Sequence, residues 1–172
     1  MRRGYIQVYT GNSKGKTTAA LGLALRAAGA GLKIFIAQFI KKRRCSEHKA
    51  LERFKDLITI NQYGTGFLKG EKPTKSEIDA ARKGLEEVKS IIASTTYDMV
   101  ILDEINVAVY HKLLNVEDIV DLLNSRPLNM EIVLTGRYAD EKIIKMADLV
   151  TEMKEIKHYY KKGVKARRGI EH

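Results

Sequence analysis

The chain has 172 residues, of which 44% are hydrophobic and 30% are charged, a composition typical of a soluble globular protein. No apolar run approaches the roughly 20 residues of a membrane-spanning helix, and the single cysteine excludes an internal disulfide, so we expect a cytoplasmic protein with no membrane contact. The formal net charge of +10 predicts an anionic ligand or partner, but no recognised nucleic-acid motif accompanies it, so we do not expect that partner to be a nucleic acid.

Strand-like and helix-like segments alternate along the chain. Short runs rich in β-branched and aromatic residues predict strands at residues 5–9, 33–39, 58–62, 99–103, 131–135 and 149–153. Apolar residues at steps of three and four, with helix-forming composition, predict helices at residues 15–30, 74–94, 105–113, 116–124 and 140–147. The alternation predicts an α/β fold of three layers, with a mostly parallel central sheet, in a single domain that covers residues 1–172.

A glycine- and lysine-rich segment joins the first predicted strand to the first predicted helix. It runs from Thr10 to Thr18 and reads TGNSKGKTT. In this setting backbone N–H groups surround phosphates, a lysine adds positive charge and a hydroxyl reaches Mg²⁺. The segment therefore predicts a P-loop that binds a nucleoside triphosphate. Its first glycine is Gly11, one residue later than the common P-loop pattern requires.

An acidic pair ends the predicted strand at 99–103. Asp103 and Glu104 follow the apolar run Met99–Leu102, as in a Walker B strand. The carboxyl end of a parallel strand lies beside the P-loop, so either carboxylate can hold Mg²⁺ together with the hydroxyl of Thr17. Spacing alone leaves open whether Glu104 orients an attacking water or ligates metal while another nucleophile attacks.

The next predicted strand ends in Thr135-Gly136-Arg137. Thr135 is a candidate for contact with a phosphate or with the metal's ligands, and Arg137 is a candidate for contact with the ligand. A plain turn explains the same three residues nearly as well.

Six segments together resemble one enzyme family. TGNSKGKTTAALGLALRAAG, AQFIK, YGTGF, MVILDEIN, VLTGR and KHYYKKGVKARRGIE occur in the order found in P-loop ATP:corrinoid adenosyltransferases, which act on cob(I)alamin or cob(I)yrinic acid a,c-diamide. The resemblance covers essentially the whole chain, and the position of Gly11 is this family's own pattern. It implies a RecA-like P-loop fold, a homodimer, and ATP and a reduced corrinoid as substrates.

The resemblance also implies the reaction. The 5′-deoxyadenosyl group of ATP passes to Co(I) of the corrinoid and triphosphate is released, in adenosylcobalamin biosynthesis or salvage. ATP would lie reversed in the loop compared with ordinary P-loop NTPases, because the 5′ carbon rather than the γ-phosphorus must be exposed. A flavoprotein is the reductant that the resemblance suggests for cobalt.

Site residues follow from the resemblance by position. Lys16, Thr17 and Glu104 are the predicted catalytic residues, Thr17, Glu104 and Asp103 are predicted to hold Mg²⁺ or Mn²⁺, and Arg137 is predicted to contact ligand. The predicted triphosphate cradle comprises Gly11, Asn12, Ser13, Lys14, Gly15, Lys16, Thr17 and Thr18. Lys14 and Lys16 would offset charge on the leaving triphosphate. Since Co(I) is itself a strong nucleophile, no general base is required.

The segment from Gly64 to Phe67 matches the part of the family that helps to enclose the corrinoid. The usual family sequence there is GFTW, whose two aromatic residues displace the lower ligand of cobalt. Phe67 matches and is predicted to bind the corrinoid, but Leu68 and Lys69 stand where Thr and Trp are usual. Two explanations stay open: the corrinoid is an incomplete one without a nucleotide loop, or Phe67 acts with a different partner.

Two other functions stay open on sequence grounds. A P-loop ATPase or phosphotransferase would use Glu104 to activate water or an acceptor hydroxyl, and it would produce phosphate or ADP. A nucleotide-dependent nucleic-acid-binding module would explain the positive charge, and its affinity would fall steeply with salt. The chain has no Trp and only four Phe, so it offers few aromatic side chains for base stacking.

Overall fold

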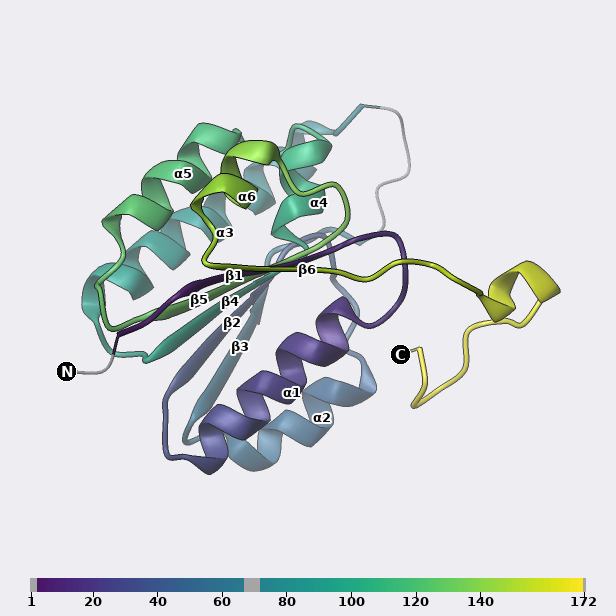
Figure 1. The fold of residues 1–172 in the computed structure, drawn as a ribbon, viewed down its shortest axis with the longest axis horizontal. Helices are drawn as coiled ribbons and strands as arrows, with labels where there is room; N and C mark the ends of the chain where they lie inside the picture. Colours follow the sequence, from purple (N-terminus) through teal and green to yellow (C-terminus); the bar gives the residue numbers. More distant parts are fainter. Residues whose placement is uncertain (1–2, 67–71, 172) are drawn as a thin grey trace.

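The computed structural model describes residues 3–66 and 72–171. A six-stranded sheet forms the centre, in the spatial order β3-β2-β4-β5-β1-β6, and every neighbouring pair is parallel (Figure 1). The strands are β1 (Ile6–Thr10), β2 (Ile34–Gln38), β3 (Ile58–Gln62), β4 (Met99–Asp103), β5 (Glu131–Thr135) and β6 (Leu149–Glu152). The predicted parallel α/β fold is confirmed.

Helices cover both faces of this sheet (Figure 1). One face carries α1 (Lys16–Gly29), α2 (Ser46–Leu51) and the 3₁₀ turn η1 (Glu52–Phe54). The other face carries α3 (Lys75–Ser94), α4 (Ile105–Tyr110), α5 (Val116–Ser125) and α6 (Glu141–Met146). After β6 the chain runs away from the sheet through the 3₁₀ turn η2 (Tyr159–Lys162) and then turns back toward the start of α1.

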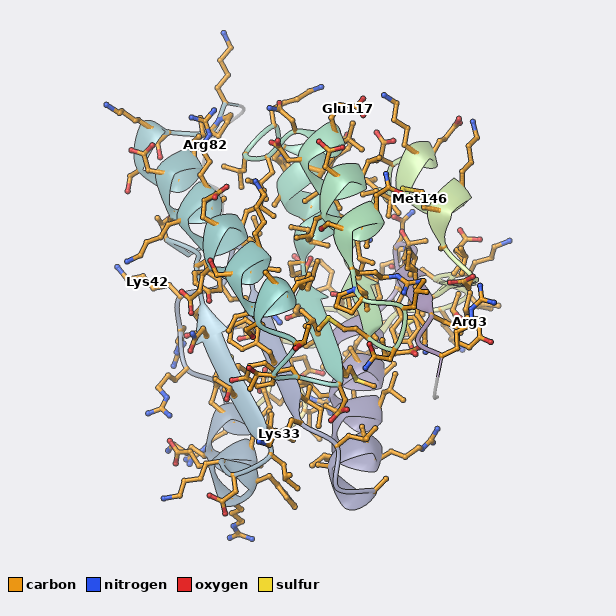
Figure 2. All side chains as sticks on the ribbon, turned by 90° about the vertical axis from the view of Figure 1, so that its left-hand side faces the viewer. Arg3, Lys33, Lys42, Arg82, Glu117 and Met146 are labelled. Atoms are coloured by element: carbon orange, nitrogen blue, oxygen red, sulfur yellow. The ribbon has the colours of Figure 1, made fainter. Side chains whose placement is uncertain are left out.

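Alternation along the strands divides the core into two layers. On the α1 face, Ile34, Ile36 and Ile101 are fully buried against the small residues Ala20 and Ala24. The small side chains at the buried positions of α1 let the helix lie close to the sheet. On the other face, the alternate strand residues pack against the apolar stripe of α3, which consists of Ala81, Leu85, Val88 and Ile92. Figure 2 shows the two helix layers on either side of the strands.

The predicted strands at 58–62, 99–103 and 131–135 have the observed bounds. The helix predicted at 105–113 ends earlier, at Tyr110. Lys112 takes a left-handed conformation (φ 61), and the N–H groups of Lys112 and Leu113 donate to Val109 and Ala108, which closes the helix in a Schellman motif. The prediction missed this end because the motif usually uses glycine.

The short helix α2 and the turns η1 and η2 were not predicted. Residues 46–51 make a helix of six residues, too short for an apolar period to show in the sequence. Within the described ranges, no helix combines the length and hydrophobicity that would let it cross a membrane.

The packing of α3 can be tested at Leu85, which is 2% exposed. We expect Leu85→Ala to lower the free energy of unfolding by about 3 kcal/mol, because it removes buried methyl groups and leaves a cavity. Arg82→Ala, on the exposed side of the same helix (Figure 2), is the matched control and should change it by less than about 0.5 kcal/mol. Urea titration measures both; equal effects of the two substitutions would contradict the assigned packing.

Candidate active site

The P-loop lies between β1 and α1 and depends on two glycines with positive φ. Gly11 has φ 97 and Gly15, the N-cap residue of α1, has φ 120, a region that other residues rarely adopt. A side chain on Gly11 would also place its Cβ 2.5 Å from the carbonyl oxygen of Met153. Glycine at position 11 is therefore required by the close approach of the chain that follows β6.

The carboxylate of Asp103, at the end of β4, connects four parts of the fold. It is 1% exposed. Its Oδ1 accepts hydrogen bonds from the hydroxyls of Thr17 (2.8 Å) and Thr135 (2.7 Å). Its Oδ2 accepts from the amide of Gln38 (3.1 Å) and from the ammonium of Lys41 (3.0 Å). These donors satisfy a buried charge that would otherwise be strongly unfavourable.

A second line of hydrogen bonds sets the orientation of Gln38. Its Oε1 lies 2.9 Å from Nε2 of His48 and accepts from Gln62 (3.1 Å). Nδ1 of His48 accepts from the backbone N–H of Cys45 (3.0 Å), so the neutral ring carries its proton on Nε2 and donates it to Gln38. Gln38 is thereby left with its NH₂ group pointing at Asp103.

The hydrogen bonds of His48 also bear on whether a nearby group of side chains is a metal site. Ligand atoms of Cys45, Glu47 and His48 lie within 4.8 Å of one another, as in some metal sites. Both ring nitrogens of His48 are already engaged in hydrogen bonds. We therefore interpret the cluster as the capping structure of α2, in which Cys45 and His48 replace the usual Ser and Glu.

Glu104 begins α4 in a left-handed conformation, with φ 62. Its backbone N–H donates to the hydroxyl of Thr135 (3.0 Å), while its carboxylate makes no capping hydrogen bond to the helix and lines the central cavity. Burial raises the pKa of Glu104, and the charge of Asp103 raises it further. A strained backbone that turns an uncommitted carboxylate into a cavity is typical of a functional residue.

The two P-loop lysines have different partners. Lys16 is buried, and its ammonium donates to the carbonyl oxygens of Gly11 and Ser13, both at 2.7 Å. Burial lowers the pKa of Lys16. Lys14 instead reaches the C-terminal segment, where its ammonium lies 2.8 Å from a carboxylate oxygen of Glu171 and 2.9 Å from the hydroxyl of Tyr159.

The C-terminal segment, residues 153–171, is fastened to the P-loop at both ends. Next to β6, the carbonyl of Met153 accepts from Ser13 N–H, and its N–H donates to Thr10, both at 2.9 Å. At the far end, the Glu171 carboxylate accepts hydrogen bonds from Arg167, Lys14 and Tyr159, and these bonds lower the pKa of Glu171 strongly. The segment therefore folds over the loop.

A cavity of about 660 Å³ lies between these parts. Its polar wall carries Lys14–Thr18, Lys41, Glu104 and Arg137, and residues 169–171 close one side. Leu21, Gly22 and Leu25, which follow the loop along α1, also line the cavity, as do Ser46, Glu47 and Ala50 of α2. A cavity lined by both cations and apolar side chains suits a nucleotide, which is anionic at one end only.

The structure brings most predicted site residues together. Lys14, Gly15, Lys16, Thr17, Thr18, Glu104 and Arg137 line the cavity, and Asp103 lies directly behind Thr17. Gly11, Asn12 and Ser13 do not line it; the carbonyls of Gly11 and Ser13 hold Lys16 instead. Phe67, with Leu68 and Lys69, lies outside the described residues.

Sequence reasoning missed three site residues: Lys41, Tyr159 and Glu171. Lys41 follows β2 closely, at the same edge of the sheet as Asp103, so the rule that located Asp103 applied to it as well. Glu171 is the one carboxylate among residues 156–171, in an otherwise basic run. That isolation was a usable signal for an ion pair.

Comparison with known proteins gives a consistent result. A model of the family described as ATP:corrinoid adenosyltransferase BtuR/CobO/CobP matches residues 2–172. The corrinoid adenosyltransferase of Escherichia coli K12 is 39% identical over 171 residues, covering 99% of this chain and 86% of that protein. The corrinoid adenosyltransferase of Pseudomonas aeruginosa is 34% identical, covering 98% of this chain and 84% of that protein.

Among solved structures, the KaiC-like protein PH0186 from Pyrococcus horikoshii is similar in fold. The TM-score is 0.61 at 17% sequence identity, over 88% of this chain and 73% of that protein. At this identity the similarity shows the fold alone, and it confirms the predicted RecA-like P-loop architecture.

The fastening of the C-terminal segment can be tested at Glu171. We expect Glu171→Gln to speed amide hydrogen exchange across residues 153–171 at pH 7, because the amide keeps the shape but loses the charge that Lys14 and Arg167 bind. The lowered pKa of Glu171 gives the sign of the pH effect: in the unsubstituted protein the contact is complete above the ordinary glutamate pKa and is lost as pH falls through the lowered value.

The control for this measurement is Glu141→Gln, an exposed glutamate on α6 far from the loop. If amide hydrogen exchange across residues 153–171 is as slow in Glu171→Gln as in this control, the proposed contact of Glu171 with Lys14 and Arg167 is contradicted.

Proposed function

Because the chain belongs to the ATP:corrinoid adenosyltransferase family, we propose that its P-loop cavity binds ATP with the triphosphate held as a leaving group. The enzyme adenosylates corrinoids with ATP, in cobalamin biosynthesis or salvage. In this reaction a bond forms between Co(I) and the 5′ carbon while the bond between that carbon and oxygen breaks. The electron pair of the broken bond leaves with triphosphate.

The observation that carries the proposal is the group of cationic side chains that line the cavity beside the start of α1. Lys14, Lys16 and Arg137 line the cavity together with the N-terminus of α1, a helix of 14 residues. A helix N-terminus adds roughly half a positive charge, and cations fixed in advance stabilise charge as it develops. Triphosphate needs this because its charge increases as the carbon–oxygen bond breaks.

The donor set beside the loop fits a divalent cation. Thr17 and Glu104 supply hydroxyl and carboxylate oxygens, which Mg²⁺ and Mn²⁺ prefer. Asp103 accepts the Thr17 proton in a 2.8 Å hydrogen bond, so the oxygen of that hydroxyl keeps its lone pairs as acceptors, one of which takes a hydrogen bond from Lys41 (3.3 Å). When bound, the cation would neutralise part of the triphosphate charge. We propose Thr17 and Glu104 as ligands, with Asp103 acting through Thr17.

The orientation of ATP follows from the chemistry required. A hydrolase must expose the γ-phosphorus to water, whereas this reaction must expose the 5′ carbon to cobalt. We propose the reversed orientation that the family resemblance implies, with the three phosphates along Lys14–Thr18. In this orientation Glu104 would bind the metal ion. The reaction does not require Glu104 to activate water, as an ATPase or phosphotransferase would.

The corrinoid would enter beside the segment that precedes Phe67. The N–H of Gly66 donates to the carbonyl of Ile40 (3.1 Å), and the next residue, Lys41, lines the nucleotide cavity. A corrinoid held by this segment would therefore lie close to the bound nucleotide. Phe67 is proposed as its contact.

We further propose a cytoplasmic homodimer that receives Co(I) from a flavoprotein reductant. The free thiol of Cys45 is compatible with a reducing compartment, and the net charge of +10 would attract an acidic reductase. Nucleic acid and membranes are not proposed as partners.

The products test this proposal most simply. With chemically reduced corrinoid, ATP and Mg²⁺ under anaerobic conditions, we expect alkylated corrinoid and intact triphosphate in equal amounts. Absorbance follows the alkylation and ion-exchange chromatography identifies the phosphate product. Production of ADP or phosphate without alkylation would contradict the proposal.

The triphosphate cradle is tested by Lys16→Ala. We expect turnover to fall by about 10²–10³-fold, because the charge closest to the leaving group is lost. Lys49→Ala, an exposed lysine on α2, is the control and should retain normal turnover. Circular dichroism checks that both variants are folded. Normal turnover in Lys16→Ala would contradict the assignment of Lys16 to the triphosphate cradle.

A further inference from the structure

Lys41 lies where the proposed metal ion would bind. Its ammonium is 3.0 Å from Oδ2 of Asp103 and 3.3 Å from the hydroxyl oxygen of Thr17. It is therefore a positive charge between the hydroxyl proposed as a metal ligand and the buried carboxylate that orients it.

The backbone holds Lys41 in this place through a strained turn. Ile40, immediately before it, has φ 69, and the Lys41 N–H donates to the carbonyl of Phe39 at 2.7 Å. This is a three-residue γ-turn of the rare kind with positive φ at its centre, which a β-branched residue adopts only under constraint. Strain of this kind persists where the surrounding structure enforces it.

The constraint comes from the glycines of the neighbouring segment. The N–H of Gly66 donates to the carbonyl of Ile40, and a Cβ on Gly64 would lie 1.9 Å from that oxygen. The chain at 64–66 thus packs directly on the turn and fixes the start of the Lys41 side chain. The far end of that side chain has more freedom, because it is 30% exposed and lines the nucleotide cavity.

A divalent cation held by Thr17 and Glu104 would repel the Lys41 ammonium, so the two cannot both lie against the hydroxyl oxygen of Thr17, from which Lys41 is 3.3 Å away. One of them must leave when the other binds. A bound triphosphate would offer the displaced ammonium acceptors, since Lys41 and the P-loop lysines line the same cavity.

We propose that Lys41 holds the cation position until a nucleotide arrives with its metal ion, and that the metal then displaces the ammonium onto the triphosphate. This inference rests on the proposed function, since it takes Thr17 and Glu104 as metal ligands. Its consequence is an order of binding: metal alone binds weakly, and metal with nucleotide binds tightly. Lys41 then becomes a further cation on the leaving group.

The test measures Mn²⁺ binding by electron paramagnetic resonance, without and with adenylyl imidodiphosphate. Lys41→Met keeps the length of the side chain and removes its charge. We expect Mn²⁺ alone to bind about tenfold more tightly to this variant, because a competing charge is gone. We expect Mn²⁺ with the nucleotide to bind about tenfold more weakly, because a charge-assisted contact to the phosphates is lost.

Lys42→Met is the matched control, an exposed lysine at the next position, and should alter neither affinity. Lys41→Arg keeps the charge and should retain weak binding of Mn²⁺ alone. If Lys41→Met changes both affinities in the same direction, or changes neither, the proposed displacement of Lys41 by the metal ion is overturned. Should Lys41→Met not fold, the result for Lys41→Arg decides: tighter binding of Mn²⁺ alone would overturn the proposal.

The experiment distinguishes failure of the proposed role of Lys41 from failure of the proposed function. If the unsubstituted protein binds Mn²⁺ with the nucleotide, but Lys41→Met binds it equally well, only the role of Lys41 fails. If the unsubstituted protein binds no Mn²⁺ with the nucleotide, the metal site itself fails, and the proposed displacement fails with it.

Discussion

A single buried carboxylate constrains the whole site. Asp103 is sealed from water and therefore needs hydrogen-bond donors, which it takes from four separate segments: α1, β5, β2 and the turn after β2. The parallel sheet makes this arrangement natural, because Gln38 lies in register with Asp103 on the neighbouring strand. The position of Thr17, and with it the start of α1, is therefore fixed by β4. This strand begins 82 residues after Thr17 in the chain.

A second carboxylate, in the C-terminal segment, fixes the P-loop in a similar way. Asp103 fixes the side of the loop at Thr17, and Glu171 binds its other side at Lys14. Two anions of the protein therefore hold the loop at two of its residues, one anion fully buried and one near the surface. A triphosphate that enters the cavity meets cations whose positions these anions have already set, which is the preorganisation that electrostatic catalysis needs.

Much of this architecture was predictable from local sequence, and the failures have physical reasons. The strand at 99–103 and its acidic end were found because the run Met99–Leu102 is apolar and the carboxylates follow at once. The sequence marks Lys41 and Glu171 by position and isolation alone, and their partners were not predicted because each contact is distant in sequence: 62 residues separate Lys41 from Asp103, and 157 separate Lys14 from Glu171. In the sequence both belong to basic segments that resemble a solvated surface.

The short helix α2 was missed for a different reason. Its cap is made by Cys45 and His48, residue types that do not mark a helix start, and its role becomes visible only when His48 is seen to orient Gln38. The role of Phe67 rests on the family resemblance, since that residue lies outside the described part of the chain.

The central claim is that Asp103, through its charge, keeps the hydroxyl of Thr17 a hydrogen-bond donor, so that the hydroxyl oxygen can bind a cation. Asp103→Asn tests it with almost no change in shape, and calorimetry of adenylyl imidodiphosphate binding with and without Mg²⁺ is the measurement. An amide NH₂ placed toward Thr17 would make that hydroxyl an acceptor and occupy the lone pair that the metal needs. We predict that affinity in the presence of Mg²⁺ falls about 10–100-fold while the melting transition stays cooperative. An unchanged affinity with Mg²⁺ would contradict the account.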